Sequence, residues 1–223
     1  MDSFGDHALV CACNGDRTIR HNCLRNVVYE EALMGGMSPT KEKAGLLPIR
    51  PPQDGTHAEP SNRNRARRRP ADVYLPRGPG NKPAALDFAC TSGLRFDRLR
   101  SAIDDPNRVC VDYEDFKRNF KPDGEDHGTE ELCRAQGFQF IPMVLESHSG
   151  GWGKTARNIL DFISQRIAAA SNDRSEACSL ALAQRLSCTL HRENAWAILR
   201  RLRCPSDAAQ PEVVARWEPS FWQ

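Results

Sequence analysis

The sequence contains no apolar run near the length that spans a lipid bilayer, and no signal-peptide pattern follows Met1. It contains no internal repeat, and its net charge of +2 over 223 residues indicates no class of partner by itself. These absences lead us to expect a soluble, intracellular protein. The length allows one domain with appendages, or two small domains.

Cysteine is abundant instead, with nine residues, an odd number. Their irregular spacing does not indicate a secreted disulfide framework, so we expect mostly reduced, partly buried thiols. Near the N-terminus, His7, Cys11 and Cys13 are residues of the types that bind zinc. A closed site needs four ligands, and Cys23 or His21 would have to complete it. The favoured alternative is a loop with ordinary free thiols.

Two short predicted strands, at residues 69–75 and 85–91, carry one carboxylate each, Asp72 and Asp87. The Gly- and Pro-rich segment between the strands lets the second fold back on the first. A carboxylate in an apolar strand is unfavourable unless it is paired, hydrogen-bonded or bound to a cation. The pattern therefore predicts a divalent metal held by Asp72 and Asp87. The alternative is that Asp72 caps a turn while Asp87 faces water.

Residues 37–69 are rich in Pro, Gly, Asn, Arg and Ser and have little periodicity, which indicates a flexible loop. Its end is basic, with arginines at Arg63, Arg65, Arg67, Arg68 and Arg69. Because the cluster runs directly into the Asp72 strand, we favour a phosphate-binding strip beside the metal. A nuclear-import signal and a solvated loop are the alternatives, and we expect a nuclear location.

The remaining pattern predicts an α/β fold. A helix is expected over 23–34 with Asn22 as its N-cap, and a second one over 110–121 carries Lys117. Residues 138–146 form the clearest strand, and Pro142 within it indicates an edge or a bulge. Two further helices, at 156–170 and 176–203, carry apolar stripes that predict packing and no chemistry.

Several short motifs occur in a characteristic order over residues 5–170. They are His7-x-x-x-Cys11, Arg20-His21-Asn22, Arg69-Pro70-Ala71-Asp72, Leu86-Asp87-Phe88-Ala89, the Lys117 helix, Phe140-Ile141-Pro142-Met143 with Glu146, and Gly150-Gly151-Trp152-Gly153. Together they resemble the restriction-endonuclease-like PD-(D/E)xK nucleases. Within that family, the chain looks most like the endonuclease region at the C-terminus of some non-LTR retrotransposon reverse transcriptase polyproteins.

The resemblance implies a partial zinc-knuckle-like leader at 1–19, a restriction-endonuclease-like domain at 20–170, and a helical extension and tail at 171–223. It also implies a DNA endonuclease that uses Mg²⁺ or Mn²⁺ to hydrolyse phosphodiester bonds. In this scheme Asp72 and Asp87 hold the metal. Lys117 steadies the attacking water or the charge on phosphorus, and Glu31 or its neighbour Glu30 completes the metal shell.

The chain departs from the family pattern in several places. Ala71 adds a residue between Pro70 and the aspartate, and Ala89 stands where the motif lysine belongs. Lys117 is therefore the candidate lysine, with Lys121 behind it. The upstream cysteine pair of the zinc knuckle is missing, and no reverse-transcriptase region is present. Two alternatives follow: a catalytically inactive relic that binds nucleic acid, or a protein-interaction domain built on the C-terminal helices.

Overall fold

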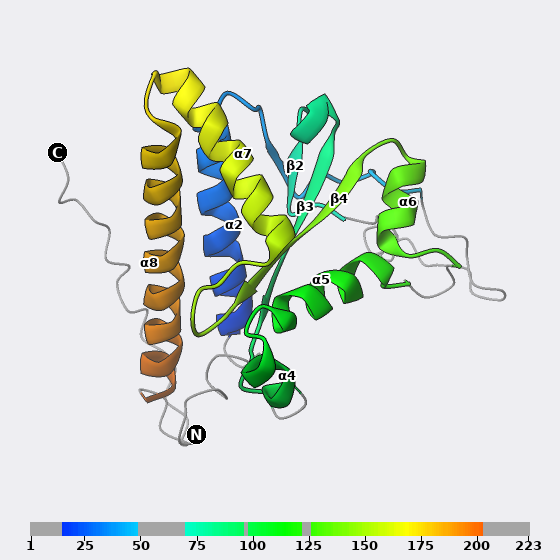
Figure 1. The fold of residues 1–223 in the computed structure, drawn as a ribbon. Helices are drawn as coiled ribbons and strands as arrows, with labels where there is room; N and C mark the ends of the chain where they lie inside the picture. Colours follow the sequence, from blue (N-terminus) through cyan, green and yellow to red (C-terminus); the bar gives the residue numbers. More distant parts are fainter. Residues whose placement is uncertain (1–14, 49–69, 96–97, 122–125, 203–223) are drawn as a thin grey trace, which may run out of the picture.

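A computed structural model describes residues 15–48, 70–95, 98–121 and 126–202 (Figure 1). Their fold is mixed α/β, which confirms the predicted class. In chain order the elements are α2 (Asp16–Met34), β1 (Thr40–Lys41), β2 (Val73–Leu75), η3 (Pro79–Asn81), β3 (Ala84–Thr91), α4 (Leu99–Asp104), α5 (Arg108–Asn119), α6 (Thr129–Ala135), β4 (Gln139–Glu146), α7 (Lys154–Ser171) and α8 (Ser175–Leu202).

The strands form one mixed sheet in the order β1-β2-β3-β4. β1, β2 and β3 are antiparallel neighbours, whereas β3 and β4 run parallel. The predicted hairpin of β2 and β3 is confirmed, and its turn uses Gly80 and Asn81 in the left-handed region, with φ of 64° and 58°. The expected edge position of the Pro142 strand is confirmed as well, since β4 ends the sheet.

Helices cover both faces of the sheet. Figure 1 shows α2, α7 and α8 side by side on one face and α5 and α6 on the other. The larger apolar cluster lies between the sheet and the first group of helices; its most buried members are Leu24, Val28, Val73, Leu75, Leu86, Met143, Leu145, Ile163, Leu182, Leu186 and Leu190. A smaller cluster, on the α6 side, contains Leu47, Ala71, Ala85, Cys133, Phe138 and Phe140. The α8 leucines thus share one core with β2, β3 and β4.

The first described helix is longer than predicted. It begins at Asp16, so the expectation of a start after Asn22 is wrong. Asp16 and Arg20 are each 2% exposed because they bury polar groups against α8: Arg200 Nε donates to Asp16 Oδ1 at 2.6 Å, and Arg20 Nη1 donates to Asn194 Oδ1 at 2.9 Å. A search for apolar periodicity overlooks such a helical face, since its buried residues are charged.

Part of the predicted flexible loop contains structure. Thr40 and Lys41 form β1, and Leu47 lies in the smaller core cluster. After β3 the chain forms the short helix α4. Within the described ranges, no helix is both long and apolar enough to cross a membrane.

Candidate active site

The register of β2 and β3 brings the two predicted metal ligands together. Val73 pairs with Leu86, and the Asp72 backbone N–H donates to the Leu86 carbonyl at 2.9 Å. Asp72 directly precedes β2, and this hydrogen bond holds it beside Leu86, the residue before Asp87 in β3. The charge of Asp72 acts on the pKa of Asp87, so the two carboxylates are neighbours. Like charges in that arrangement repel, and the surroundings must compensate.

Each carboxylate has a cationic or polar partner on one oxygen. Asp72 Oδ2 lies 3.0 Å from His21 Nε2 on α2 and accepts the Phe88 backbone N–H at 2.6 Å. Asp87 Oδ2 accepts a hydrogen bond from Lys117 Nζ on α5 at 2.7 Å. The side chains of His21, Asp72, Asp87 and Lys117 are between 22% and 26% exposed. The cluster is therefore sheltered but remains open to solutes.

The pKa values of the two aspartates are shifted in opposite directions. Burial alone would raise the pKa of Asp72, but hydrogen bonds from His21 and the Phe88 N–H, with the charge of His21, lower it below the ordinary value. Burial raises the pKa of Asp87, and the nearby charge of Asp72 adds to the effect, while Lys117 opposes it. Carboxylates whose environments separate their pKa values in this way are typical of acid–base and metal sites.

His21 is a site residue whose contact with Asp72 was not predicted. Burial by itself would lower the pKa of His21, yet the hydrogen bond and the charge of Asp72 raise it above 6.5. The imidazole packs edge-on against Phe88 with ring centroids 6.3 Å apart, and Phe88 packs in the same way on Trp152 at 6.5 Å. In the sequence, the only indication that His21 belongs to the site was its place in the Arg20-His21-Asn22 motif of the resemblance.

The site offers two carboxylates to a cation. The hydrogen bonds from His21, Phe88 and Lys117 all reach the Oδ2 atom of Asp72 or Asp87. In the described part of the chain, no group of three or more His, Cys, Asp or Glu side chains is arranged to hold a metal. Mg²⁺ is commonly bound through one or two carboxylates, with waters and substrate phosphates completing its shell. The pair thus fits a magnesium ion that is completed by its substrate.

Glu31 does not join this site. It is bound by Arg185 of α8, with 2.7 Å from Nη1 to Oε1, and Glu30 is bound by the same guanidinium. Ten helical residues separate Glu31 from His21, which is about 15 Å along the axis. The expectation that Glu31 or Glu30 completes the metal shell is not met, because both face α8 and not the sheet.

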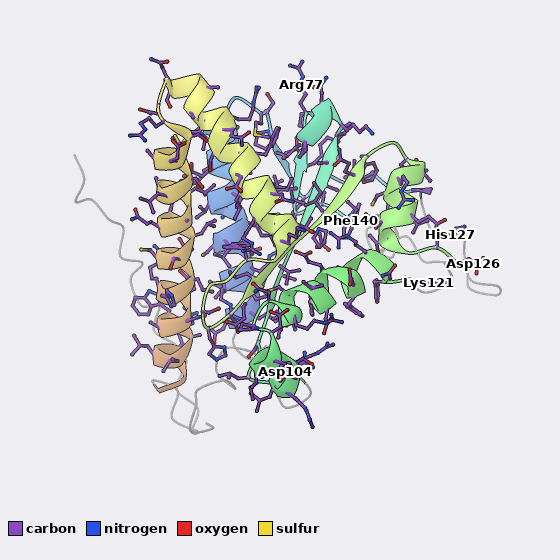
Figure 2. The ribbon with its side chains drawn as sticks, in the orientation of Figure 1. Arg77, Asp104, Lys121, Asp126, His127 and Phe140 are labelled. Atoms are coloured by element: carbon purple, nitrogen blue, oxygen red, sulfur yellow. The ribbon has the colours of Figure 1, made fainter. Side chains whose placement is uncertain are left out.

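The structure distinguishes between the two candidate lysines. Lys117 is the one that contacts Asp87. Lys121 lies one turn further along and is exposed, beyond the last residue of α5 (Figure 2). The possible zinc ligands His7, Cys11 and Cys13 and the basic strip Arg63, Arg65, Arg67, Arg68 and Arg69 lie outside the described residues.

No known family model matches the chain, and no curated protein or solved structure does.

Proposed function

We propose that this domain hydrolyses phosphodiester bonds in DNA, with Mg²⁺ held by Asp72 and Asp87. The observation that carries the proposal is the convergence of Asp72, directly before β2, with Asp87 of β3 and Lys117 of α5. Two carboxylates beside a lysine amine are the groups that metal-assisted phosphoryl chemistry requires.

Each residue has a role that follows from its surroundings. Asp72 is ionised at neutral pH because its pKa is lowered, and the Phe88 N–H fixes its orientation as an oxygen ligand. Asp87 supplies the second oxygen ligand. Lys117, already within 2.7 Å of Asp87, is placed to hold the negative charge that develops on phosphorus. When bound, the metal supplies polarisation of the phosphate and a water of lowered pKa.

An aromatic row on α5 supports a nucleic-acid substrate. Tyr113 and Phe116 have ring centroids 5.6 Å apart, and Phe116 and Phe120 follow at 5.7 Å. Phe116 is 53% exposed and Phe120 48%, so these two rings are not buried in the core and can contact a ligand. The row lies beside Lys117 on the same helix, and exposed aromatic rings next to a basic group are typical platforms for stacking bases.

A binding module without cleavage is the second candidate. The observation that favours it is the ion pair of Lys117 with Asp87, which occupies one metal-ligand oxygen. The protein-interaction alternative has less support, even though α8 exposes Leu180, Trp196 and Leu199, because Asp72, Asp87 and Lys117 are gathered and not scattered.

Nicking of supercoiled plasmid tests the proposal. The wild-type chain, Asp87→Ala and Asp104→Ala are compared with Mg²⁺, with Mn²⁺ and with EDTA. Asp104 is an exposed carboxylate on α4, remote from the sheet carboxylates, and is the matched control (Figure 2). We expect metal-dependent nicking that Asp87→Ala abolishes and Asp104→Ala retains. Retarded DNA without nicking would favour the binding module, and equal loss in both variants would contradict the assignment of Asp87.

A further inference from the structure

A second polar site lies where the parallel strands β3 and β4 end. It is a cavity of about 290 Å³ whose lining includes Arg17 and Arg20 of α2 and Arg95 from the loop after β3. Thr91, the last residue of β3, and Ser147, directly after β4, form part of its floor. Ligands of α/β proteins commonly bind beyond the carboxyl ends of parallel strands.

The charge in this arginine pocket has one sign. Its described lining contains three guanidinium groups and no carboxylate. Cys90 also lines it, but burial raises the pKa of the Cys90 thiol, which stays neutral and cancels none of the positive charge. The remaining lining groups are hydroxyls: Thr91, Ser92, Ser147 and Tyr113.

The pocket is built on fixed groups. Arg20 is 2% exposed, and its Nη1 donates to Asn194 of α8 at 2.9 Å. Glu146 holds the loops that follow both strands, since its carboxylate accepts the backbone N–H groups of Gly93 at 3.2 Å, His148 at 2.9 Å and Ser149 at 2.6 Å. These contacts hold Arg20 and the two loops that border the pocket in place.

We propose that the arginine pocket binds a phosphate group of a nucleic-acid strand. Guanidinium groups match phosphate oxygens in two-pronged, charge-assisted hydrogen bonds, and hydroxyls add donors. The cavity is near the lower end of ligand pockets, about 300–1,000 Å³, so it suits one phosphate with its sugar and not a large cofactor.

The pocket adjoins the candidate active site through two elements. Tyr113 precedes Lys117 by one turn of α5, about 6 Å, and Thr91 follows Asp87 by four strand residues, about 13 Å. Phosphates in one DNA strand advance by about 3.4 Å per nucleotide. The pocket therefore holds a phosphate a few nucleotides away from the one at Asp87. This placement rests on the proposed nuclease function, whereas phosphate binding by the pocket does not.

Binding measured in EDTA tests the pocket without requiring cleavage. Fluorescence anisotropy compares a short single-stranded oligonucleotide with and without a 5′-phosphate. The pocket variant is Arg17→Gln with Arg95→Gln, both at exposed positions. The control, Arg77→Gln with Arg174→Gln, removes the same charge elsewhere; Arg77 lies in the β2–β3 turn, at the other end of β3 (Figure 2). Melting curves show that each variant is folded, and Arg95→Gln alone replaces the pair if the double variant is not.

We expect the pocket variant to bind at least about tenfold more weakly than wild type, and the control less than about threefold. Inorganic phosphate should compete with the oligonucleotide on the wild-type chain better than chloride at equal ionic strength.

Tighter binding of the 5′-phosphorylated strand would identify a terminal phosphate as the ligand, and equal binding an internal one. Equal loss in both double variants, or wild-type binding by the pocket variant, would overturn the proposal. If nicking fails while this pattern holds, the nuclease assignment is wrong and the pocket stands.

Discussion

Asp72, directly before β2, and Asp87, in β3, are electrostatic neighbours, yet the pKa of Asp72 is lowered and that of Asp87 is raised. The difference follows from their contacts. Asp72 accepts a backbone N–H and pairs with His21, whereas Asp87 is desolvated, accepts no backbone N–H that the pKa shift reflects, and feels the charge of Asp72 beside Lys117. A cation shared between them would relieve their repulsion.

Asp87→Asn should separate stability from activity. Because the folded-state pKa of Asp87 is raised, stability falls as pH rises from its ordinary value of 3.8 through the folded value. Asparagine imitates the protonated form, so we expect the variant to melt at a higher temperature at pH 7. This advantage should shrink toward pH 3.8. Plasmid nicking should fall by about 100-fold or more. A less stable variant at neutral pH would show that the ion pair with Lys117 outweighs burial.

Magnesium should stabilise the fold through the same carboxylates. If the dissociation constant is near 1 mM, then 10 mM Mg²⁺ adds about 1.4 kcal/mol to the free energy of unfolding. A thermal-shift titration measures this directly. The shift should disappear in Asp87→Asn and persist in Asp104→Ala. An equal shift in all three proteins would place the bound magnesium elsewhere.

The sequence predicted those parts of the fold whose signals are local. The turn residues between β2 and β3 and the apolar stripes of α7 and α8 correspond to observed elements. The start of α2 was missed because its inner face buries Asp16 and Arg20, and their partners Arg200 and Asn194 come from the far end of the chain.

In the candidate site, too, some contacts could be predicted from the sequence and others could not. The proximity of Asp72 and Asp87 was predictable from the hairpin, whereas Lys117 was chosen on the resemblance to the nucleases, and the structure shows it in contact with Asp87. The contact of His21 with Asp72 joins residues 51 positions apart, so the spacing of residues in the sequence does not predict it. Glu31 was assigned to the wrong site for a related reason. Helical periodicity gives the face of α2 on which it lies, but only the structure shows that this side chain contacts Arg185 of α8.

Glu31→Gln tests that reassignment. We expect nicking to stay within about twofold of wild type, because Glu31 lies about 15 Å from His21 along α2. Stability should fall by about 1 kcal/mol in low salt and by less in high salt, since the Arg185 partner is partly exposed. Urea unfolding at two salt concentrations measures the difference. A large loss of nicking in a fully folded variant would indicate that Glu31 does contribute to the metal site.

Leu186→Ala tests whether α8 belongs to the same cooperative unit as the sheet. Leu186 is 1% exposed in the larger core cluster, so truncation should cost about 2–5 kcal/mol. Leu180→Ala, on the same helix but 60% exposed, is the control and should change stability by less than about 0.5 kcal/mol. Far-UV and near-UV circular dichroism should lose signal in one transition. Two separate transitions would indicate that α8 unfolds independently.

His21→Gln should flatten the pH dependence of stability near neutrality. Asp72 raises the folded-state pKa of His21 above 6.5, so the protonated pair stabilises the fold fully below pH 6.5 and loses this contribution as pH rises through the folded value. We expect the variant to be about 1 kcal/mol less stable than wild type at pH 6, with the gap closing as pH rises through the folded-state pKa. Urea unfolding across this range measures the slope.

His127→Gln is the matched control, because His127 is 58% exposed and contacts only Glu131 among the described residues, with 3.0 Å from Nδ1 to Oε2. It should keep the wild-type slope. If His21→Gln keeps that slope too, the imidazole stays neutral in the folded protein. Asp72 would then be oriented by a neutral imidazole and the Phe88 N–H, without a positive charge from His21.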